Sequence, residues 1–441
     1  MTKSRFSRRQ FLGGLTKAML ATAIAPRVLS SGASAAARPA SERINVLSIG
    51  TGNQGRDLLS NFLGLPDCQL AGLCDPYGKN RNLAMQKVQA AYGSECKSYV
   101  DFEEALAEPS IDAVVIATPD HWHSAMILAA VRAGKAVYCE KPLALSLNQN
   151  RAIQNAVRSS GAVFQYGTMQ RSMPNIRLAV ELVRGGVIGD LKRLDVWAAG
   201  SASGGSTAEI PVPPDLDYNL YTGPANMRPC TADRITNKGS WYCSDYALGF
   251  IAGWGAHPLD VAIWGMDSDL SGPYELRGSG KFPVSGLYDT ATDWDVEIAF
   301  ADGLPMHFFS RGPASKYVDY RPLDTGDGTT FFGTKGWVSV SRGVIYASNP
   351  DWLKIPIPKA SEHVVYKPNY YQAFLDSTRY RTSTLTSVDD AVRSDAISHL
   401  SNLVIRTGEP IVWDPKTYQI RSPKPLNRLM DLPTRGPWAT T

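Results

Sequence analysis

The residues with the clearest chemical meaning lie in a glycine-rich turn that follows a strand-like run over residues 44–49. The turn contains Gly50, Gly52, Asn53, Gln54 and Gly55. The first glycine permits a tight turn, the second lets the backbone approach a bound group, and the third lets the next helix pack close to the strand. Free N–H groups at the start of that helix attract phosphates. The spacing therefore predicts a site for the pyrophosphate of a dinucleotide.

An acid, Asp75, closes the next strand-like run over residues 69–74. A carboxylate at this position accepts hydrogen bonds from the adenosine ribose hydroxyls and repels a 2′-phosphate. The sequence therefore favours NAD as the cofactor. Lys79 and Arg81 follow closely enough to leave NADP open.

Two later loops carry further reactive groups. Thr118, Pro119 and His123 follow the strand-like run over residues 111–117, and Glu140 and Lys141 follow the run over 136–139. Ligands bind beyond the carboxyl ends of strands in an open parallel sheet, so both loops are expected to face the cofactor. Burial and the positively charged ring of the cofactor would favour a neutral amine, which makes Lys141 a candidate base for a hydroxyl group.

His121 and His123 are too close in sequence, without a third ligand, to predict a metal site. His123 is expected either to contact the cofactor or substrate or to start a helix. None of the six cysteines forms a Cys-x-x-Cys pair, which argues against structural zinc. Cys230 and Cys243 flank one loop, and a disulfide between them is left open.

The elements that must position these groups change in character along the chain. Up to residue 166, β-rich runs alternate with helical stretches near 80–91, 123–133 and 147–159, a pattern typical of a doubly wound parallel sheet. After residue 166, a helical stretch over 176–184 and a strand over 191–197 precede a Gly/Ser/Pro-rich segment over 200–240, whose length suggests a functional loop. Strand-like runs over 293–348 and helices near 370–378 and 388–405 predict an α+β second domain.

The first residues read as an export signal. Ser7, Arg8, Arg9 and Phe11 belong to a twin-arginine motif, and a short apolar stretch leads to small residues that offer cleavage after Ala37. The formal net charge is +4, but residues 1–37 hold six basic residues and no acid, so the remainder carries a charge of −2. The composition therefore gives no argument for nucleic-acid binding. We expect a signal peptide (1–37), a dinucleotide-binding domain (38–166), a second domain (167–441), and a periplasmic location.

Several motifs occur in order along the chain. They are Gly50-x-Gly52-x-x-Gly55, Thr118-Pro119-x-x-x-His123, Glu140-Lys141-Pro142, Gly167-Thr168-Met169-Gln170-Arg171-Ser172 and Gly255-Ala256-His257. With this set the chain resembles the Gfo/Idh/MocA family (glucose–fructose oxidoreductase and inositol dehydrogenase), most closely its exported twin-arginine branch. The resemblance runs from about residue 43 to the closing Pro437-Trp438.

The resemblance implies an α/β fold: an N-terminal Rossmann domain, then a C-terminal α+β domain with a large, open, mostly antiparallel sheet that often forms homodimer or tetramer contacts. It also implies a tightly held NAD(P) and a carbohydrate substrate. Lys141 would be the catalytic lysine and His257 the partner that relays the proton. Family dehydrogenases commonly carry an aspartate four residues before this histidine, where this chain has Gly253. Asp260 would either hydrogen-bond His257 on the same helical face or serve the structure alone.

Further side chains are candidates for contacts with the substrate, because aromatic faces suit sugar C–H surfaces and polar groups suit hydroxyls. These candidates are Tyr166, Gln170, Arg171, Trp241, Tyr242, Asp245 and His257. The leading expectation is an exported oxidoreductase for a sugar or sugar derivative, with a cofactor recycled in place. One alternative is a glycoside hydrolase that uses NAD for transient oxidation. The other, suggested by Gly253, is a catalytically impaired sugar-binding protein.

Overall fold

The computed structural model describes residues 42–355 and 364–438. The predicted signal peptide lies outside these residues. In the described part of the chain, no helix is both long enough and apolar enough to cross a membrane.

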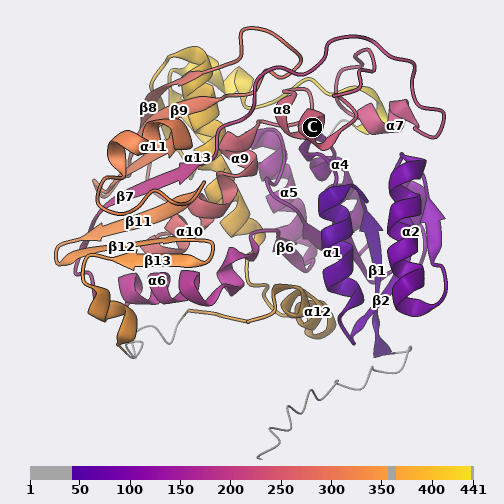
Figure 1. The fold of residues 1–441 in the computed structure, drawn as a ribbon, viewed down its shortest axis with the longest axis horizontal. Coiled ribbons are helices and arrows are strands. Elements are labelled where there is room, and N and C mark those ends of the chain that lie inside the picture. Colours follow the sequence, from indigo (N-terminus) through magenta and orange to yellow (C-terminus); the bar gives the residue numbers. More distant parts are fainter. Residues whose placement is uncertain (1–41, 356–363, 439–441) are drawn as a thin grey trace, which may run out of the picture. The chain divides into compact units, whose positions relative to one another are not determined.

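The N-terminal sheet has six parallel strands in the order β3-β2-β1-β4-β5-β6 (Figure 1). Its strands are β1 (Ile44–Ile49), β2 (Cys68–Cys74), β3 (Lys97–Tyr99), β4 (Ala113–Ile116), β5 (Ala136–Cys139) and β6 (Phe164–Tyr166). The connecting helices are α1 (Asn53–Leu63), α2 (Gly78–Tyr92), α3 (Phe102–Leu106), α4 (His123–Arg132) and α5 (Leu147–Ser160). The strand order reverses between β1 and β4, which is where such sheets bind ligands.

The second sheet has nine strands in the order β13-β12-β11-β7-β10-β9-β8-β14-β15. They are β7 (Leu191–Ala198), β8 (Tyr274–Lys281), β9 (Asp293–Ala299), β10 (Pro305–Ser310), β11 (Gly328–Gly333), β12 (Gly336–Ser341), β13 (Val344–Ala347), β14 (Ile411–Asp414) and β15 (Gln419–Ser422). All neighbouring pairs are antiparallel except β7 and β10. The predicted fold class, a Rossmann domain followed by a mostly antiparallel α+β domain, is therefore confirmed.

Helices α6, α10 and α13 pack against the second sheet. The helices after β6 are α6 (Pro174–Arg184), α7 (Tyr218–Thr222), α8 (Asn237–Tyr242), α9 (Phe250–Gly253), α10 (Ala256–Met266), α11 (Arg311–Tyr317), α12 (Tyr370–Tyr380) and α13 (Val388–Thr407). In β9, Trp294, Val296 and Ile298 are buried, whereas the residues between them are more exposed. This alternation matches the sequence pattern that predicted the strand, because successive side chains of a strand point to opposite faces.

Helix α12 lies between strands β13 and β14 of the second sheet in sequence but packs against the first sheet. Tyr370 and Phe374 join the core formed by β1, β2 and α1, where the ring of Phe374 lies 6.2 Å from that of Phe62 and 5.8 Å from that of Tyr138. Helix α13 is stabilised at its start by a capping box in which Ser387 and Asp390 exchange hydrogen bonds. The C-terminal part of the chain thus returns to the N-terminal sheet, and the proposed boundary at residue 166 stays a prediction.

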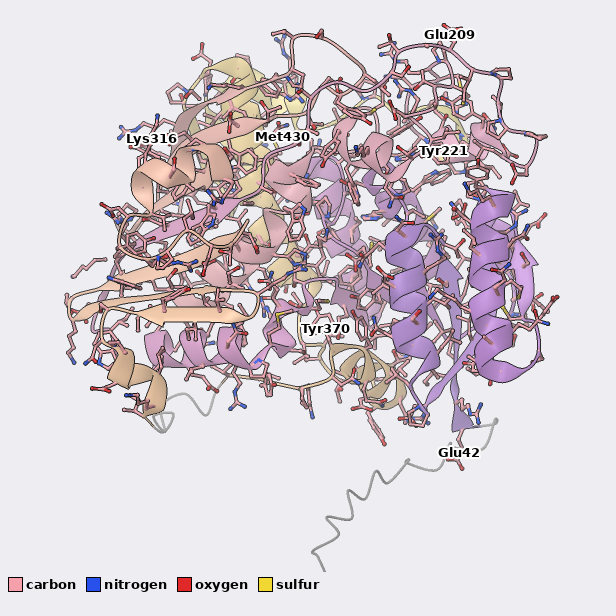
Figure 2. All side chains as sticks on the ribbon, viewed as in Figure 1. Glu42, Glu209, Tyr221, Lys316, Tyr370 and Met430 are labelled. Atoms are coloured by element: carbon pink, nitrogen blue, oxygen red, sulfur yellow. The ribbon has the colours of Figure 1, made fainter. Side chains whose placement is uncertain are left out.

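The segment between β7 and α9 is less irregular than its composition suggests. We call residues 200–249 the cover segment. It contains the short helices α7 and α8, each started by a side chain that caps the helix, Asp217 and Thr236. Figure 2 shows Glu209 and Tyr221 of this segment above the N-terminal ends of α1 and α2.

Candidate active site

A cavity of about 970 Å³ lies above the carboxyl ends of the N-terminal strands. It is lined by the glycine turn after β1, the loops after β2, β4 and β5, helix α9, the start of α10 and the cover segment. Its size is near the upper end of the range for small-molecule and cofactor sites. The cavity therefore gathers groups that are up to 322 residues apart in the sequence, from Ile49 to Tyr371.

Each glycine of the turn meets the steric need that its position predicted. Gly50 has a φ of +82°, and a Cβ on Gly55 would lie 1.9 Å from the carbonyl oxygen of Gly50. A Cβ on Gly52 would meet only the side chain of Asn237, at 4.0 Å, so that glycine borders open space in the cavity. No side chain caps the start of α1, and its first N–H groups remain available to an anion. These residues fit the pyrophosphate of a dinucleotide.

Asp75, the first residue after β2, is hydrogen-bonded to the start of the glycine turn. Its carboxylate accepts hydrogen bonds from the backbone N–H of Thr51 at 2.7 Å and of Tyr77 at 2.8 Å. Burial raises the pKa of Asp75, and these hydrogen bonds oppose that shift. The carboxylate borders the cavity, at the position where a ribose would be recognised.

Glu140 connects the glycine turn with the catalytic lysine expected from the sequence. Gln54 donates a hydrogen bond of 3.1 Å to Glu140, and Lys141 follows directly in the chain. The Nζ atom of Lys141 donates to the backbone carbonyl of Gly253 in α9 at 2.8 Å. Both Lys141 and Gly253 line the cavity. The carbonyl of residue 253 thus binds the amine at the position where the family resemblance implies a carboxylate.

His257 lines the same end of the cavity. Its side chain is only 4% exposed, and its Nδ1 atom has no hydrogen-bond partner among the described residues. Burial lowers the pKa of His257 well below its ordinary value, and the charges of Lys141 and Arg342 act in the same direction. A neutral imidazole with an unpaired nitrogen is suited to accept or relay a proton.

Of the residues predicted to contact the cofactor, all but Gly55 and His123 line the cavity. The lining residues are Gly50, Gly52, Asn53, Gln54, Asp75, Thr118, Pro119, Glu140 and Lys141. Gly55 does not line the cavity but packs closely against the carbonyl group of Gly50. His123 is fully buried, with Nδ1 2.7 Å from the carbonyl oxygen of Pro142 and Nε2 3.0 Å from that of Thr118. Its pKa falls to about 4 because of burial. It joins the two loops behind the site.

The structure places three of the substrate candidates in the interior, away from the cavity lining. Tyr166 is fully buried and donates to Asp395 at 2.5 Å, and Gln170 donates to Asp327 at 3.4 Å. Arg171 lies in a buried ion pair, described next. Their polar groups are occupied by partners distant in sequence, which corrects their assignment to the substrate.

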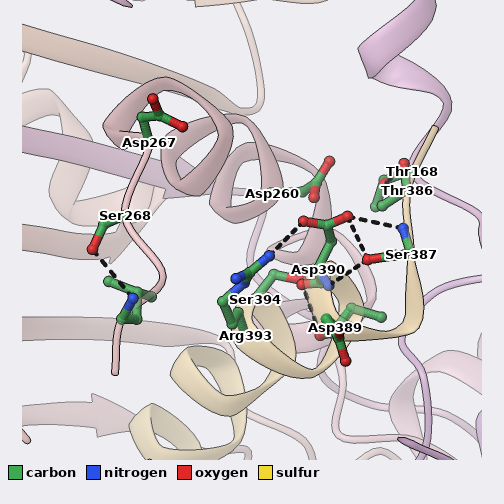
Figure 3. Close-up of polar contacts among 12 residues, drawn as sticks. Thr168, Asp260, Asp267, Ser268, Thr386, Ser387, Asp389, Asp390, Arg393 and Ser394 are labelled. Atoms are coloured by element: carbon green, nitrogen blue, oxygen red, sulfur yellow. Dashed lines mark hydrogen bonds and ion pairs between the residues drawn. The ribbon is translucent and has the colours of Figure 1, made fainter. Parts of the chain in front are cut away.

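Asp260 binds Arg171 and not His257. Its carboxylate accepts hydrogen bonds from Nε and Nη2 of Arg171 at 2.8 and 2.6 Å. Figure 3 shows Asp260 beside Asp390 and Arg393, and Asp390 Oδ1 lies 3.5 Å from Arg171 Nη2. Of the two roles left open for Asp260, the structural one fits this geometry, so the catalytic assignment is corrected.

The remaining substrate candidates are divided. Trp241 lines the cavity and is 42% exposed. Tyr242 and Asp245 do not line it; Tyr242 packs on Phe250, and Asp245 pairs with Arg234 at 3.0 Å.

Cys230 and Cys243 are both free thiols. Among the described residues, no three metal-ligating side chains come together.

The sequence interpretation missed an aromatic wall and a cation. Phe250 and Trp254 line the cavity, with ring centres 6.1 Å apart, and the ring of Trp254 lies 5.9 Å from that of His257. Arg342, from the turn between β12 and β13, also lines the cavity. The aromatic residues beside Gly255-Ala256-His257 could have been noticed, whereas no local signal marks Arg342.

The sequence model of an oxidoreductase family with an NAD-binding Rossmann fold, Gfo/Idh/MocA, matches residues 44–168. The inositol 2-dehydrogenase of Rhizobium meliloti is 30% identical to this chain over 175 residues, which cover 40% of this chain and 48% of that protein. Residues 44–168 therefore match the Gfo/Idh/MocA family. The matched domain has the NAD-binding Rossmann fold of that family.

Other relatives extend the similarity over more of the chain. An uncharacterised oxidoreductase of Bacillus subtilis is 22% identical over 375 residues, which cover 82% of this chain and 94% of that protein. The solved structure of a levoglucosan dehydrogenase, in complex with NADH and levoglucosan, has a TM-score of 0.59 and 17% identity. The match covers 85% of this chain and 100% of the levoglucosan dehydrogenase chain. The curated inositol 2-dehydrogenase is matched over about half of its length, and at 17% identity the structure shows the fold alone.

Proposed function

We propose that this protein is an exported NAD-dependent oxidoreductase of the Gfo/Idh/MocA family that acts on a CH–OH group of a sugar or sugar derivative. The observation that carries the proposal is that one cavity holds the dinucleotide turn, the amine of Lys141 and the neutral imidazole of His257. The similarity to an inositol dehydrogenase and to a levoglucosan dehydrogenase supports a polyhydroxylated substrate. Asp75 favours NAD over NADP, because its carboxylate would repel a 2′-phosphate.

The bound cofactor would supply a hydride acceptor at its nicotinamide ring. Lys141 would take the proton of the substrate hydroxyl as hydride leaves the same carbon. The hydrogen bond to the carbonyl of Gly253 would hold the amine in place. The neutral imidazole of His257 would then accept the proton at the buried end of the cavity. The aromatic wall of Phe250 and Trp254 excludes water and offers a face to the C–H surface of a sugar ring.

The test of this proposal uses purified protein without added nucleotide. Denaturation is expected to release NAD(H), and a panel of sugars and polyols is expected to produce the absorbance band of bound NADH. Release of no nucleotide, or no band with any sugar, would contradict it. Release of aglycone from nitrophenyl glycosides without net NADH formation would favour the hydrolase instead.

The cover segment explains why the cofactor would stay bound in a compartment without fresh NAD. The backbone carbonyl of Asp215 accepts a hydrogen bond of 2.8 Å from the N–H of Gly78, and its carboxylate accepts one of 2.9 Å from the N–H of Lys79, both at the start of α2. Trp122 donates to the carbonyl of Leu220 at 3.0 Å. The segment is thus held to the loops after β2 and β4, on both sides of the dinucleotide turn.

Replacing Asp215 by alanine is expected to speed the release of NAD about fivefold. The carboxylate caps α2, and loss of such a cap costs about 1 kcal/mol. Release is measured by trapping free NAD with an excess of a second NAD-binding enzyme. Glu209→Ala, on the exposed part of the same segment, is the control and should change nothing. Equal release rates in wild type and Asp215→Ala would show that the cover segment does not retain the cofactor.

Replacing Gly253 by aspartate introduces the carboxylate that the family resemblance implies at this position. The nearest atom to an added Cβ, in the ring of Phe250, lies 3.9 Å away, so the position accepts a Cβ without a clash. A carboxylate there would attract the ammonium form of Lys141. The rise of the hydride-transfer rate with pH is therefore expected to move to higher pH. An unchanged pH profile in a folded variant would mean that residue 253 does not act on the base.

A further inference from the structure

Arg342 carries the only cavity-lining guanidinium at the lysine–histidine end of the site among the described residues. Within the described part of the chain, no hydrogen bond or ion pair of its side chain is found, and its Nε atom is buried without a partner. Burial raises the pKa of Asp327 and the charge of Arg342 opposes that rise, yet the hydrogen bonds to the Asp327 oxygens come from Gln170 and Ser341, both at 3.4 Å. An unpaired donor group of this kind is costly unless a ligand binds it.

The position of Arg342 is fixed by the fold. Ser341 and Val344 pair across a two-residue turn whose second residue, Gly343, has a φ of +75°. Asn175 in α6 donates to both flanking carbonyls, at 2.7 Å to Ser341 and 3.0 Å to Val344. A hairpin tip held in this way presents its cation at low entropic cost.

Arg342 points to the substrate end of the cavity and not to the phosphate end. Its guanidinium lies 4.9 Å from the ring centre of Trp254, which is itself 5.9 Å from the ring of His257. The charge of Arg342 lowers the pKa of His257 and opposes the rise in the pKa of Glu140, both of which are close to Lys141. Asp75, beside the dinucleotide turn, shows no such influence.

We propose that Arg342 binds a carboxylate on the substrate, so that the natural substrate is a sugar acid or a glycoside of one. A guanidinium offers a planar pair of donors that matches a carboxylate. The neighbouring aromatic wall would take the C–H face of the same ring. This inference rests on the proposed oxidoreductase function, because it names the substrate class of that site.

The experiment compares matched sugars on the NAD-loaded protein: glucose with glucuronate, and galactose with galacturonate. Binding is measured by calorimetry and hydride transfer by the absorbance of bound NADH. The carboxylates are expected to bind about 10–100-fold more tightly, the range of one charge-assisted bidentate contact. In Arg342→Gln this preference should disappear, because the affinity for each acidic sugar falls to that for the matched neutral sugar.

Lys335→Gln is the matched control, because it removes a positive charge from the exposed turn at the other end of the same strand, β12. It should keep the full preference. Equal affinity for neutral and acidic sugars would overturn the inference while leaving the oxidoreductase proposal intact. Loss of NAD from Arg342→Gln would also overturn it, since the arginine would then bind the cofactor. Equal binding of glucose 6-phosphate and glucuronate would overturn the assignment of a carboxylate.

Carboxylate preference lost in Arg342→Gln, but without NADH formation from any sugar, would support the inference and sink the oxidoreductase proposal. The failure of the inference and the failure of the oxidoreductase proposal can therefore be told apart. Calorimetry measures sugar binding whether or not the protein transfers hydride.

Discussion

Replacing Lys141 by methionine is expected to slow hydride transfer about 10²–10⁴-fold and to leave the NAD content of the protein unchanged. This is the range over which a positioned acid or base contributes to a reaction. Methionine keeps the length of the side chain and removes the amine that donates to the carbonyl of Gly253. Single-turnover formation of bound NADH after mixing with substrate measures the effect.

Lys192→Met is the control, because Lys192 is exposed on β7 and does not line the cavity. His257→Ala is expected to lower the rate as well, since this neutral imidazole lines the same cavity as Lys141. A rate that survives both replacements would remove the two residues from the reaction. A variant that loses NAD would assign Lys141 to cofactor binding instead.

The interpretation of the glycine turn succeeded because its logic is local. The backbone conformation of Gly50 and the contact of Gly55 with the Gly50 carbonyl are decided within six residues. The strands were equally readable, since β4 is a fully buried apolar run and β9 alternates. The positions of Lys141 and His257 in the cavity agree with what the family resemblance implied.

The interpretation failed where a polar side chain finds its partner far along the chain. Arg171 and Asp260 are 89 residues apart, and Tyr166 and Asp395 are 229 apart. Sequence spacing places Asp260 on the same face of α10 as His257, but it cannot reveal that a guanidinium from another element competes for the carboxylate. Arg342 was missed for the same reason, because only the fold brings the β12–β13 turn to the cavity.

Replacing Asp260 by asparagine is expected to destabilise the protein by about 3 kcal/mol, the lower end of the range for a broken buried ion pair, because the buried Arg171 guanidinium keeps only the 3.5 Å ion pair with Asp390. Both side chains are almost inaccessible, at 7% exposure for Arg171 and 1% for Asp260. Denaturant unfolding of the NAD-loaded protein measures the loss. The double variant Arg171→Met with Asp260→Asn also removes the buried positive charge. It should therefore regain a large part of the lost free energy of unfolding.

Acid should weaken the same cluster. Although burial raises the pKa of Asp390, the charge of Arg171 and hydrogen bonds from Ser387 lower it to about 2, from an ordinary value of 3.8. A lowered carboxyl pKa gives stability that is complete above pH 3.8 and is lost as the pH falls toward 2. In Arg171→Met this loss of stability should be smaller, because the pKa of Asp390 in the folded protein is then lowered less from its ordinary value.

The control for Asp260→Asn is the same substitution at Asp267, directly after α10. Asp267 is 65% exposed, pairs with Arg184 and has a φ of 54°, a conformation that asparagine also accepts. Its replacement should cost less than about 1 kcal/mol. If the role of Asp260 is structural, the hydride-transfer rate of folded Asp260→Asn should stay within a few fold of the wild-type rate. A stable Asp260→Asn protein with a rate lowered 100-fold or more would restore Asp260 to the proton relay of His257.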